Sequence, residues 1–245
     1  MKWIKIPFII LWRLWFYILV ILPIIIMMPA LLVTTAREKY YKYVYAIARL
    51  WAKIVLYGMG FIPKVTYKTQ LEKGRSYMLT ANHTSMIDIM MMFYVSKHPF
   101  VFIGKKELAR FPVFGFFYKR SCILVDRKNA KSRHQAFKEA ERRLSQGTSI
   151  CIFPEGGVPD DVSIKLDRFK KGAFRLALEH QIPIVPISFL DNKTKFRYQF
   201  LTGRPGKLRA IVHPLVETEG MPLDTASKKT LEDKTRAAIE SSLIW

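Results

Sequence analysis

The sequence predicts an α/β fold, in which a single catalytic domain has a mostly parallel or mixed central sheet flanked by helices. Three observations support it. After Gly60 and Pro63, short apolar runs rich in Ile, Val and Phe alternate with charged helical stretches, as in chains of βα units. The length of 245 residues suits one such domain with an appendage. The appendage is an N-terminal pair of helices, the first hydrophobic and the second amphipathic, so we expect membrane-docking helices in residues 1–60 and the catalytic domain in residues 61–245.

The first helix of this pair is long enough to cross a membrane. Leu14 to Ala36 contain no charged residue, and a helix of that length would cover about 34 Å against a bilayer core of about 30 Å. Pro23 and Pro29 interrupt the segment, so a kinked or re-entrant helix competes with a straight span. A signal peptide is disfavoured, because the apolar run is too long and no A-x-A cleavage site follows it.

The second helix, expected at residues 40–62, has an interfacial pattern. Lys42, Arg49 and Lys53 fall on one stripe, away from its apolar positions. Such a helix would lie in the headgroup plane with aromatic residues at the boundary. These aromatic residues are Tyr40, Tyr41, Tyr43, Tyr45, Trp51 and Tyr57. The alternative is an ordinary amphipathic helix on the surface of the domain.

The catalytic domain is expected to alternate strands with helices. Strands are predicted at residues 77–81, 100–103, 121–125, 149–153, 184–189 and 208–212. Helices are predicted at residues 87–95, 131–145, 170–180 and 225–243.

Charge and cysteine content restrict the partners and the compartment. Lys and Arg number 40 against 19 Asp and Glu, a formal charge of +21, which indicates anionic partners such as an acidic bilayer, an acidic soluble molecule or nucleic acid. The apolar N-terminal segment argues against nucleic acid. Cys122 and Cys151 each lie inside an expected strand, so neither a disulfide framework nor a thiolate metal site is expected, and the catalytic part should face a reducing compartment.

The first candidate catalytic motif is His83 with Asp88, where an expected strand passes into a helix. Ser85 is a natural N-cap with Asp88 at the third helical position, from which a carboxylate can reach back to a ring before the helix. A carboxylate that holds one imidazole nitrogen prepares the other to act as a general base. The spacing alone is weak, since chance gives it in roughly one chain in six, and Asp88 as a plain helix cap is the alternative.

Two further motifs follow other expected strands. Glu155 and Gly156 lie in the segment Phe-Pro-Glu-Gly-Gly, whose glycines would let backbone amides approach a ligand. Lys105 and Arg127 follow two more strands, where cations can bind a phosphate. A tight turn and a solvated basic face are the ordinary explanations of these two motifs.

In this order, with the Ile-Pro-Ile-Val-Pro segment at residues 182–186, the motifs resemble the glycerophospholipid acyltransferases, specifically the bacterial 1-acylglycerol-3-phosphate acyltransferases. The resemblance covers roughly residues 60 to 215. It implies that an acyl group passes directly from acyl-CoA or acyl carrier protein, as co-substrate, to a lysophospholipid, giving phosphatidic acid.

The resemblance also implies a role for each candidate residue. His83 would be the base and Asp88 would orient it, Lys105 and Arg127 would bind the acceptor phosphate, and Glu155 with Gly156 would position the glycerol. No metal or redox cofactor is implied. The partners would be membrane lipids and not nucleic acid, with the protein at the cell membrane and its catalytic domain facing the cytoplasm.

One departure from the family pattern puts the acceptor in question. The family continues Phe-Pro-Glu-Gly with Thr and Arg, whereas this chain has Gly157 and Val158. Lys165, Arg168 or Lys170 in the following loop could supply the lost cation. The alternatives are therefore an acyltransferase for another lysolipid, such as a lyso-aminolipid, and a non-enzymatic basic module for nucleic acid or anionic lipid.

Overall fold

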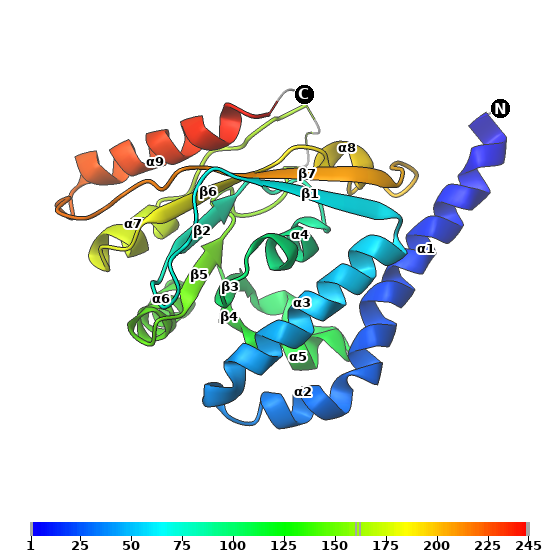
Figure 1. Ribbon diagram of the computed structural model, residues 1–245, viewed down its shortest axis with the longest axis horizontal. Coiled ribbons are helices and arrows are strands. Elements are labelled where there is room, and N and C mark those ends of the chain that lie inside the picture. The colour runs from blue at the N-terminus through cyan, green and yellow to red at the C-terminus, as the bar shows by residue number, and fades with distance from the viewer. Residues whose placement is uncertain (1, 160, 162, 244–245) are drawn as a thin grey trace.

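The computed structural model describes residues 2–159, 161 and 163–243. Its centre is a seven-stranded sheet in the order β1-β7-β6-β2-β5-β3-β4 (Figure 1). The strands are β1 (Phe61–Tyr67), β2 (Met78–Ala81), β3 (Phe100–Lys105), β4 (Cys122–Val125), β5 (Ser149–Ile152), β6 (Ile184–Phe189) and β7 (Gly206–Val212). Within the run β6-β2-β5-β3-β4 every adjacent pair of strands is parallel. β7 runs antiparallel to β6, and β1 is parallel to β7, so the predicted mixed sheet is confirmed.

Helices cover both faces of the sheet. The longer ones are α1 (Lys2–Ile26), α2 (Met28–Thr34), α3 (Tyr41–Gly58), α4 (Asp88–Val95), α5 (Phe114–Ser121), α6 (Ala130–Ser145), α7 (Gly172–Glu179) and α9 (Thr225–Glu240). The short ones are η1 (Glu38–Tyr40), η2 (Lys106–Arg110) and α8 (Asn192–Lys195). Two separate hydrophobic cores result, one under α3, α4 and α5 and the other under α6, α7 and α9 (Figure 1).

The six predicted strands and four predicted helices are all present, with ends within three residues of the prediction. β1 and α5 were not predicted. β1 alternates buried Phe61 and Pro63 with exposed neighbours, but a proline inside a short run argues against a strand. Here the strand lies at the edge of the sheet, where proline is tolerated.

The N-terminal apolar segment forms two helices instead of one. α1 ends at Ile26, and α2 begins at Met28 with Pro29 in its first turn, where a missing N–H costs no helical hydrogen bond. The interruption predicted from the prolines is therefore confirmed, although it falls at Met27. Within α1, Ile6–Ile26 is long and apolar enough to cross a membrane, by length and composition, and the helix exposes large apolar side chains such as Phe8 and Ile26.

Helix α3 belongs to the core of the domain. Tyr45 and Trp51 are buried, and the hydroxyl groups of Tyr41 and Tyr45 donate to the carbonyl oxygens of Phe100 and Ser96 at 2.7 and 3.1 Å. The expectation of a membrane boundary is therefore wrong for Tyr45 and Trp51, whereas Tyr43 and Tyr57 are exposed and their place at a membrane surface stays a prediction. Of the helix's predicted stripe of basic residues, Lys42 and Lys53 are exposed, whereas Arg49 is partly buried and donates to the carbonyl oxygen of Phe93 at 3.1 Å.

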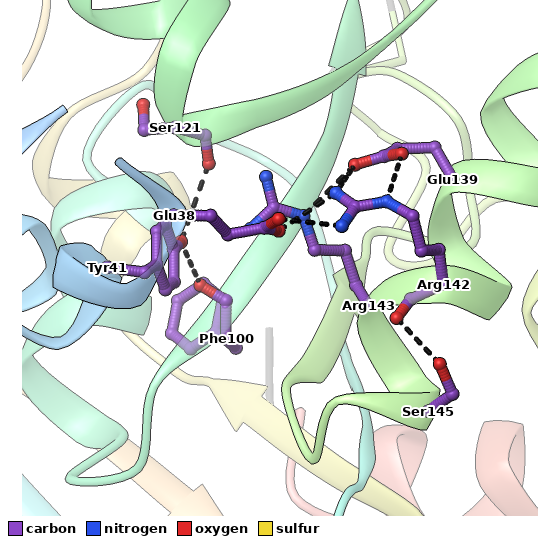
Figure 2. A network of polar contacts seen from close by, with 8 residues as sticks. All are labelled: Glu38, Tyr41, Phe100, Ser121, Glu139, Arg142, Arg143 and Ser145. Atoms are coloured by element: carbon purple, nitrogen blue, oxygen red, sulfur yellow. Dashed lines mark hydrogen bonds and ion pairs between the residues drawn. The ribbon is translucent and has the colours of Figure 1, made fainter. Parts of the chain in front are cut away.

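Polar contacts fix the start of α3 to the opposite face of the sheet (Figure 2). Glu38 accepts hydrogen bonds from Arg142 at 2.6 and 2.8 Å and forms an ion pair with Arg143 of α6. Because these groups are partly exposed, the pairs contribute little free energy of unfolding but define a position. The division of the chain at residue 60 stays a prediction, since α1 and α3 share one core with β1 and β3.

Candidate active site

His83 and Asp88 meet at the carboxyl end of β2. Nδ1 of His83 lies 2.9 Å from Oδ2 of Asp88, and the carboxylate is fully buried while the imidazole keeps a sixth of its surface exposed. Nδ1–H therefore donates to the carboxylate, which leaves Nε2 as the acceptor nitrogen. This is the geometry that a general base needs.

The loop before α4 brings the two side chains together. Oδ2 of Asp88 also accepts the backbone N–H groups of Thr84 and Ser85 at 2.7 and 2.8 Å, which is the backward reach expected of a capping-box carboxylate. The predicted N-cap at Ser85 is wrong, because Ile87 is the N-cap of α4 and the Ser85 hydroxyl donates to the carbonyl oxygen of Phe196. Helix α4 begins only at Asp88, so His83 lies outside it, as the predicted meeting requires.

A residue that the sequence analysis missed holds the second carboxylate oxygen. Nδ2 of Asn192, in α8, donates to Oδ1 of Asp88 at 2.7 Å, and Asn192 is fully buried. Four donors thus surround Asp88 and fix the orientation of its carboxylate. Asn192 lies just past the carboxyl end of β6, and that position was the available signal.

Glu155 ties the third motif to the catalytic loop. It is 3% exposed, and its two oxygens accept the backbone N–H groups of His83 at 2.6 Å and Asp167 at 2.8 Å. Burial raises its pKa to about 7, since the charged form loses hydration. The carboxylate thus faces the catalytic loop and does not line the neighbouring cavity.

An apolar cavity of about 360 Å³ opens beside His83. The imidazole stacks on the ring of Phe153 with 4.2 Å between centroids, and Phe153 stacks in turn on Phe102. The cavity continues between α3, α4 and α5, where aromatic and aliphatic side chains line it, among them Trp51, Phe93, Phe102, Phe114 and Phe117. Its shape and lining suit a hydrocarbon chain whose reacting end lies at His83.

Lys105 and Arg127 both line this cavity. Among the residues that the structure describes, Nη1 of Arg127 is buried and has no hydrogen-bond partner, and burial lowers the pKa of its guanidinium. A buried donor without an acceptor is costly, so the position favours a ligand with an oxygen acceptor. The two cations differ in their surroundings, because Lys105 also lines a second pocket and Arg127 a third.

The second pocket has a volume of about 260 Å³ and lies against the catalytic loop at Thr84. Lys105, Lys193 and Arg197 line it, together with Val158. Lys193 is 9% exposed and donates to the carbonyl oxygen of Ile164 at 2.6 Å, while burial and the charge of Arg197 lower its pKa. The sequence analysis missed Lys193 and Arg197, which become neighbours of this pocket only through the fold.

Lys165, Arg168 and Lys170, which were expected to replace the missing family arginine, do not line the second pocket. Lys170 contacts Gly156, where a Cβ would lie 2.5 Å from Nζ, and both residues line the third pocket. Gly156 has φ of 80°, a conformation that glycine adopts without strain. Neither Lys165 nor Arg168 lines the second pocket, although the charge of Lys165 contributes to the lowered pKa of Lys193.

Arg13 of α1 fixes the segment that bounds the second pocket. Its guanidinium donates to the carbonyl oxygens of Arg197, Gln199 and Thr202 at 2.7, 3.1 and 2.6 Å, and it lies 3.9 Å from the ring centroid of Phe196. Arg13 is 1% exposed, so carbonyl dipoles and the aromatic face replace the water that a guanidinium normally contacts. Hydrogen bonds from α1 thus hold the segment that lines the second pocket.

Neither cysteine is suited to form an acyl-enzyme. Both thiols are free. Burial raises the pKa of Cys122 to about 12 and that of Cys151 well above its ordinary value. The thiolate is the nucleophilic form, so these groups are inert near neutral pH.

Fold and site together define an α/β domain in which a His–Asp pair lies beside an apolar cavity and nearby cations. The model of the family described as Acyltransferase matches residues 62–190, more than half of the chain, and the chain belongs to this family.

Curated relatives and a solved structure resemble the chain over most of its length. The 1-acyl-sn-glycerol-3-phosphate acyltransferase alpha of Ovis aries is 31% identical over 78% of this chain and 66% of its own. The 1-acyl-sn-glycerol-3-phosphate acyltransferase of Borreliella burgdorferi is 26% identical over 81% of this chain and 78% of its own. The crystal structure of the LPA acyltransferase PlsC from Thermotoga maritima has the same fold, with a TM-score of 0.78, 24% identity, and coverage of 98% of this chain and 97% of its own. Several other curated relatives are longer, and the chain spans 47 to 57% of their length.

Proposed function

We propose that this protein transfers a fatty acyl group from a thioester donor to the free hydroxyl of 1-acylglycerol-3-phosphate and so makes phosphatidic acid for phospholipid synthesis. The observation that carries the proposal is the His83–Asp88 pair, which opens on an apolar cavity with Lys105 at its margin. Curated relatives named for this activity support it.

The chemistry is a direct transfer. Nε2 of His83 takes the proton of the acceptor hydroxyl while the hydroxyl oxygen attacks the thioester carbonyl carbon. The new C–O bond forms, the C–S bond breaks, and the thiolate leaves with the proton from the imidazolium. Asp88 stabilises that imidazolium, and Glu155 holds the loop that carries His83. The scheme uses acyl-CoA or acyl carrier protein as co-substrate and calls for no metal or redox step.

The acceptor phosphate fits the pocket of Lys105, Lys193 and Arg197. In 1-acylglycerol-3-phosphate the phosphate is carried by the carbon next to the one bearing the free hydroxyl, so its binding site must lie close to His83. This pocket adjoins the catalytic loop at Thr84. Its cations compensate for Val158, which stands where the family has an arginine, and cations on a phosphate give strong hydrogen bonds.

Membrane attachment suits this reaction, because acceptor and product are both lipids. The apolar helix α1 would anchor the protein. The excess of basic residues would attract anionic lipid, and the catalytic domain would face the cytoplasm at the cell membrane.

The test is acyl transfer by the purified full-length protein to a panel of lysolipids. We expect lysophosphatidate to be acylated in preference to lysophosphatidylcholine and to a phosphate-free lyso-aminolipid. Lys193→Ala and Arg197→Ala should each raise the Michaelis constant for lysophosphatidate about tenfold or more. Lys53→Ala, which removes an exposed lysine of α3, is the control. If the lyso-aminolipid were preferred, as Val158 favours, it would be the acceptor in place of lysophosphatidate. If no acceptor were acylated, the proposed acyltransferase activity would be wrong.

A further inference from the structure

A large groove runs between α6 and α7 and joins the catalytic cavity. Its volume is about 940 Å³. Ile103, Arg127 and Phe153 line both the groove and the cavity. A molecule lying in the groove can therefore place one end beside His83, whose ring stacks on Phe153.

The groove is basic along its walls. Five Lys and Arg side chains line it against two Glu side chains, and one of these, Glu179, forms an ion pair with Arg175 at 2.9 Å. The five cations are Arg127, Arg133, Lys138, Lys170 and Arg175. A groove with this balance attracts an anionic ligand.

The inner end of the groove offers hydrogen-bond donors, and its floor is apolar. Nη1 of Arg127 is a buried donor without a partner among the described residues, and Lys170, whose Nζ lies against Gly156, lines the same groove. Ala136, Ala173 and Leu176 supply apolar surface between α6 and α7. The groove thus combines apolar surface and a buried donor with exposed cations of α6 and α7.

The two substrates of the proposed reaction place their phosphates at different distances from the reacting atoms. The acceptor phosphate lies next to the attacked centre, which fits the small pocket of Lys105, Lys193 and Arg197. In a thioester of phosphopantetheine, an uncharged arm with two amides separates the sulfur from the phosphate. Such a ligand needs a long site, with donors along the arm and cations at the far end.

We propose that the groove between α6 and α7 binds the phosphopantetheine arm of the acyl donor. The assignment rests on the proposed function and deepens it. Arg127 and Lys170 donate to the carbonyl oxygens of the arm, and Lys138 and Arg175 bind its phosphate. Arg127 therefore serves the donor, whereas the family resemblance assigns it to the acceptor phosphate.

Steady-state kinetics with the full-length protein separate these two roles. With decanoyl-CoA as donor, Arg127→Ala and Lys170→Ala should raise the Michaelis constant for the donor about ten- to a hundredfold, because each removes a charged donor. The Michaelis constant for lysophosphatidate should change less than twofold. Lys119→Ala, which removes an exposed lysine of α5 outside the groove, is the matched control.

A second pair of variants distinguishes the two sources of the arm. Lys138 is assigned to the phosphate that both donors carry, so Lys138→Glu on the exposed rim should raise the Michaelis constant for both. Decanoyl-acyl carrier protein presents the same arm on an acidic protein surface, so a rise confined to this donor would place Lys138 at that surface and overturn its assignment to the phosphate. Lys119→Glu repeats the charge change outside the groove. Thermal unfolding of each variant identifies loss of folding, and if Arg127→Ala or Lys170→Ala is unfolded, Lys138→Glu carries the test with Lys119→Glu as its control.

The outcomes separate this inference from the proposed function. Wild-type protein that acylates lysophosphatidate, with a donor constant unchanged in the Arg127, Lys170 and Lys138 variants, would overturn the donor groove and leave the function standing. If Arg127→Ala raised only the Michaelis constant for lysophosphatidate, Arg127 would bind the acceptor phosphate and not the donor. Wild-type protein inactive with both donors would remove the proposed function itself.

Discussion

The side-chain amide of Asn192 donates to the buried carboxylate of Asp88 at 2.7 Å, which joins α8 to the start of α4. The other carboxylate oxygen holds His83 and two backbone N–H groups. Asn192 does not touch the cavity beside His83, so it acts on the reaction through Asp88.

We predict that Asn192→Ala lowers kcat about ten- to a hundredfold, because Asp88 loses a hydrogen bond that fixes its orientation. The Michaelis constants of both substrates should stay within twofold. Asn192→Asp should lower kcat further, because it places a second carboxylate against Asp88. The pH–rate profile should then shift to higher pH. A change confined to the Michaelis constants would show that Asn192 shapes a substrate pocket instead.

His83→Ala should lower kcat by about 10²–10⁴-fold, the usual contribution of a general base. The free energy of unfolding should change little, because the ring is partly exposed and its main partner, Asp88, keeps three other donors. His98→Ala removes a histidine outside the cavity beside His83 and serves as the control. Near-normal turnover by a folded His83→Ala protein would eliminate this mechanism.

Arg13→Met keeps the length and apolar stem of the side chain but removes its donors. Three carbonyl groups of the segment at residues 197–202 then lose their buried partner, so the free energy of unfolding should fall by about 3 kcal/mol or more. The Michaelis constant for lysophosphatidate should rise as well, because Arg197 belongs to that segment. Denaturation in a mild detergent and acceptor kinetics measure the two effects, and a stable variant with normal kinetics would contradict the role given to Arg13.

His213 predicts a pH dependence of stability that is separate from catalysis. It is buried, with Nε2 2.8 Å from the hydroxyl of Ser188, and burial lowers its pKa to about 4. The unfolded chain binds a proton at His213 near pH 6.5, and the folded protein binds it only near pH 4. The contribution of the neutral side chain to the free energy of unfolding is therefore complete above pH 6.5 and declines as the pH falls towards 4.

The measurement is the difference in unfolding free energy between wild-type protein and His213→Gln, which cancels the titration of all other groups. This difference should change by about 2 kcal/mol in favour of the variant between pH 7.5 and pH 5. A difference independent of pH would mean that His213 titrates alike in both states.

The alternation of apolar runs and charged stretches was sufficient to predict the parallel part of the sheet, because buried parallel strands leave that pattern in sequence. The edge strand β1 was not predicted because Pro63 interrupts its apolar run. For α3, a period of basic residues could not show which face would be buried. That depends on the partners Phe93 and Phe100, far along the chain.

For the site, the pairing of His83 with Asp88 was predictable because a single turn contains both residues. Asn192, Lys193 and Arg197 were not, since the sheet order brings the carboxyl end of β6 beside that of β2. Glu155 was identified by its place after a strand, but only the structure assigns its oxygens to the N–H groups of His83 and Asp167.

The contact between Arg13 and the segment at residues 197–202 makes the apolar helix and the phosphate pocket parts of one equilibrium. Thermodynamic linkage then acts in both directions. A bilayer that stabilised α1 in this position would raise the affinity of the pocket for its ligand, and a ligand in the pocket would stabilise α1 by the same factor. On the proposed function, an acceptor lipid would thus strengthen the attachment of α1, and its release would weaken it.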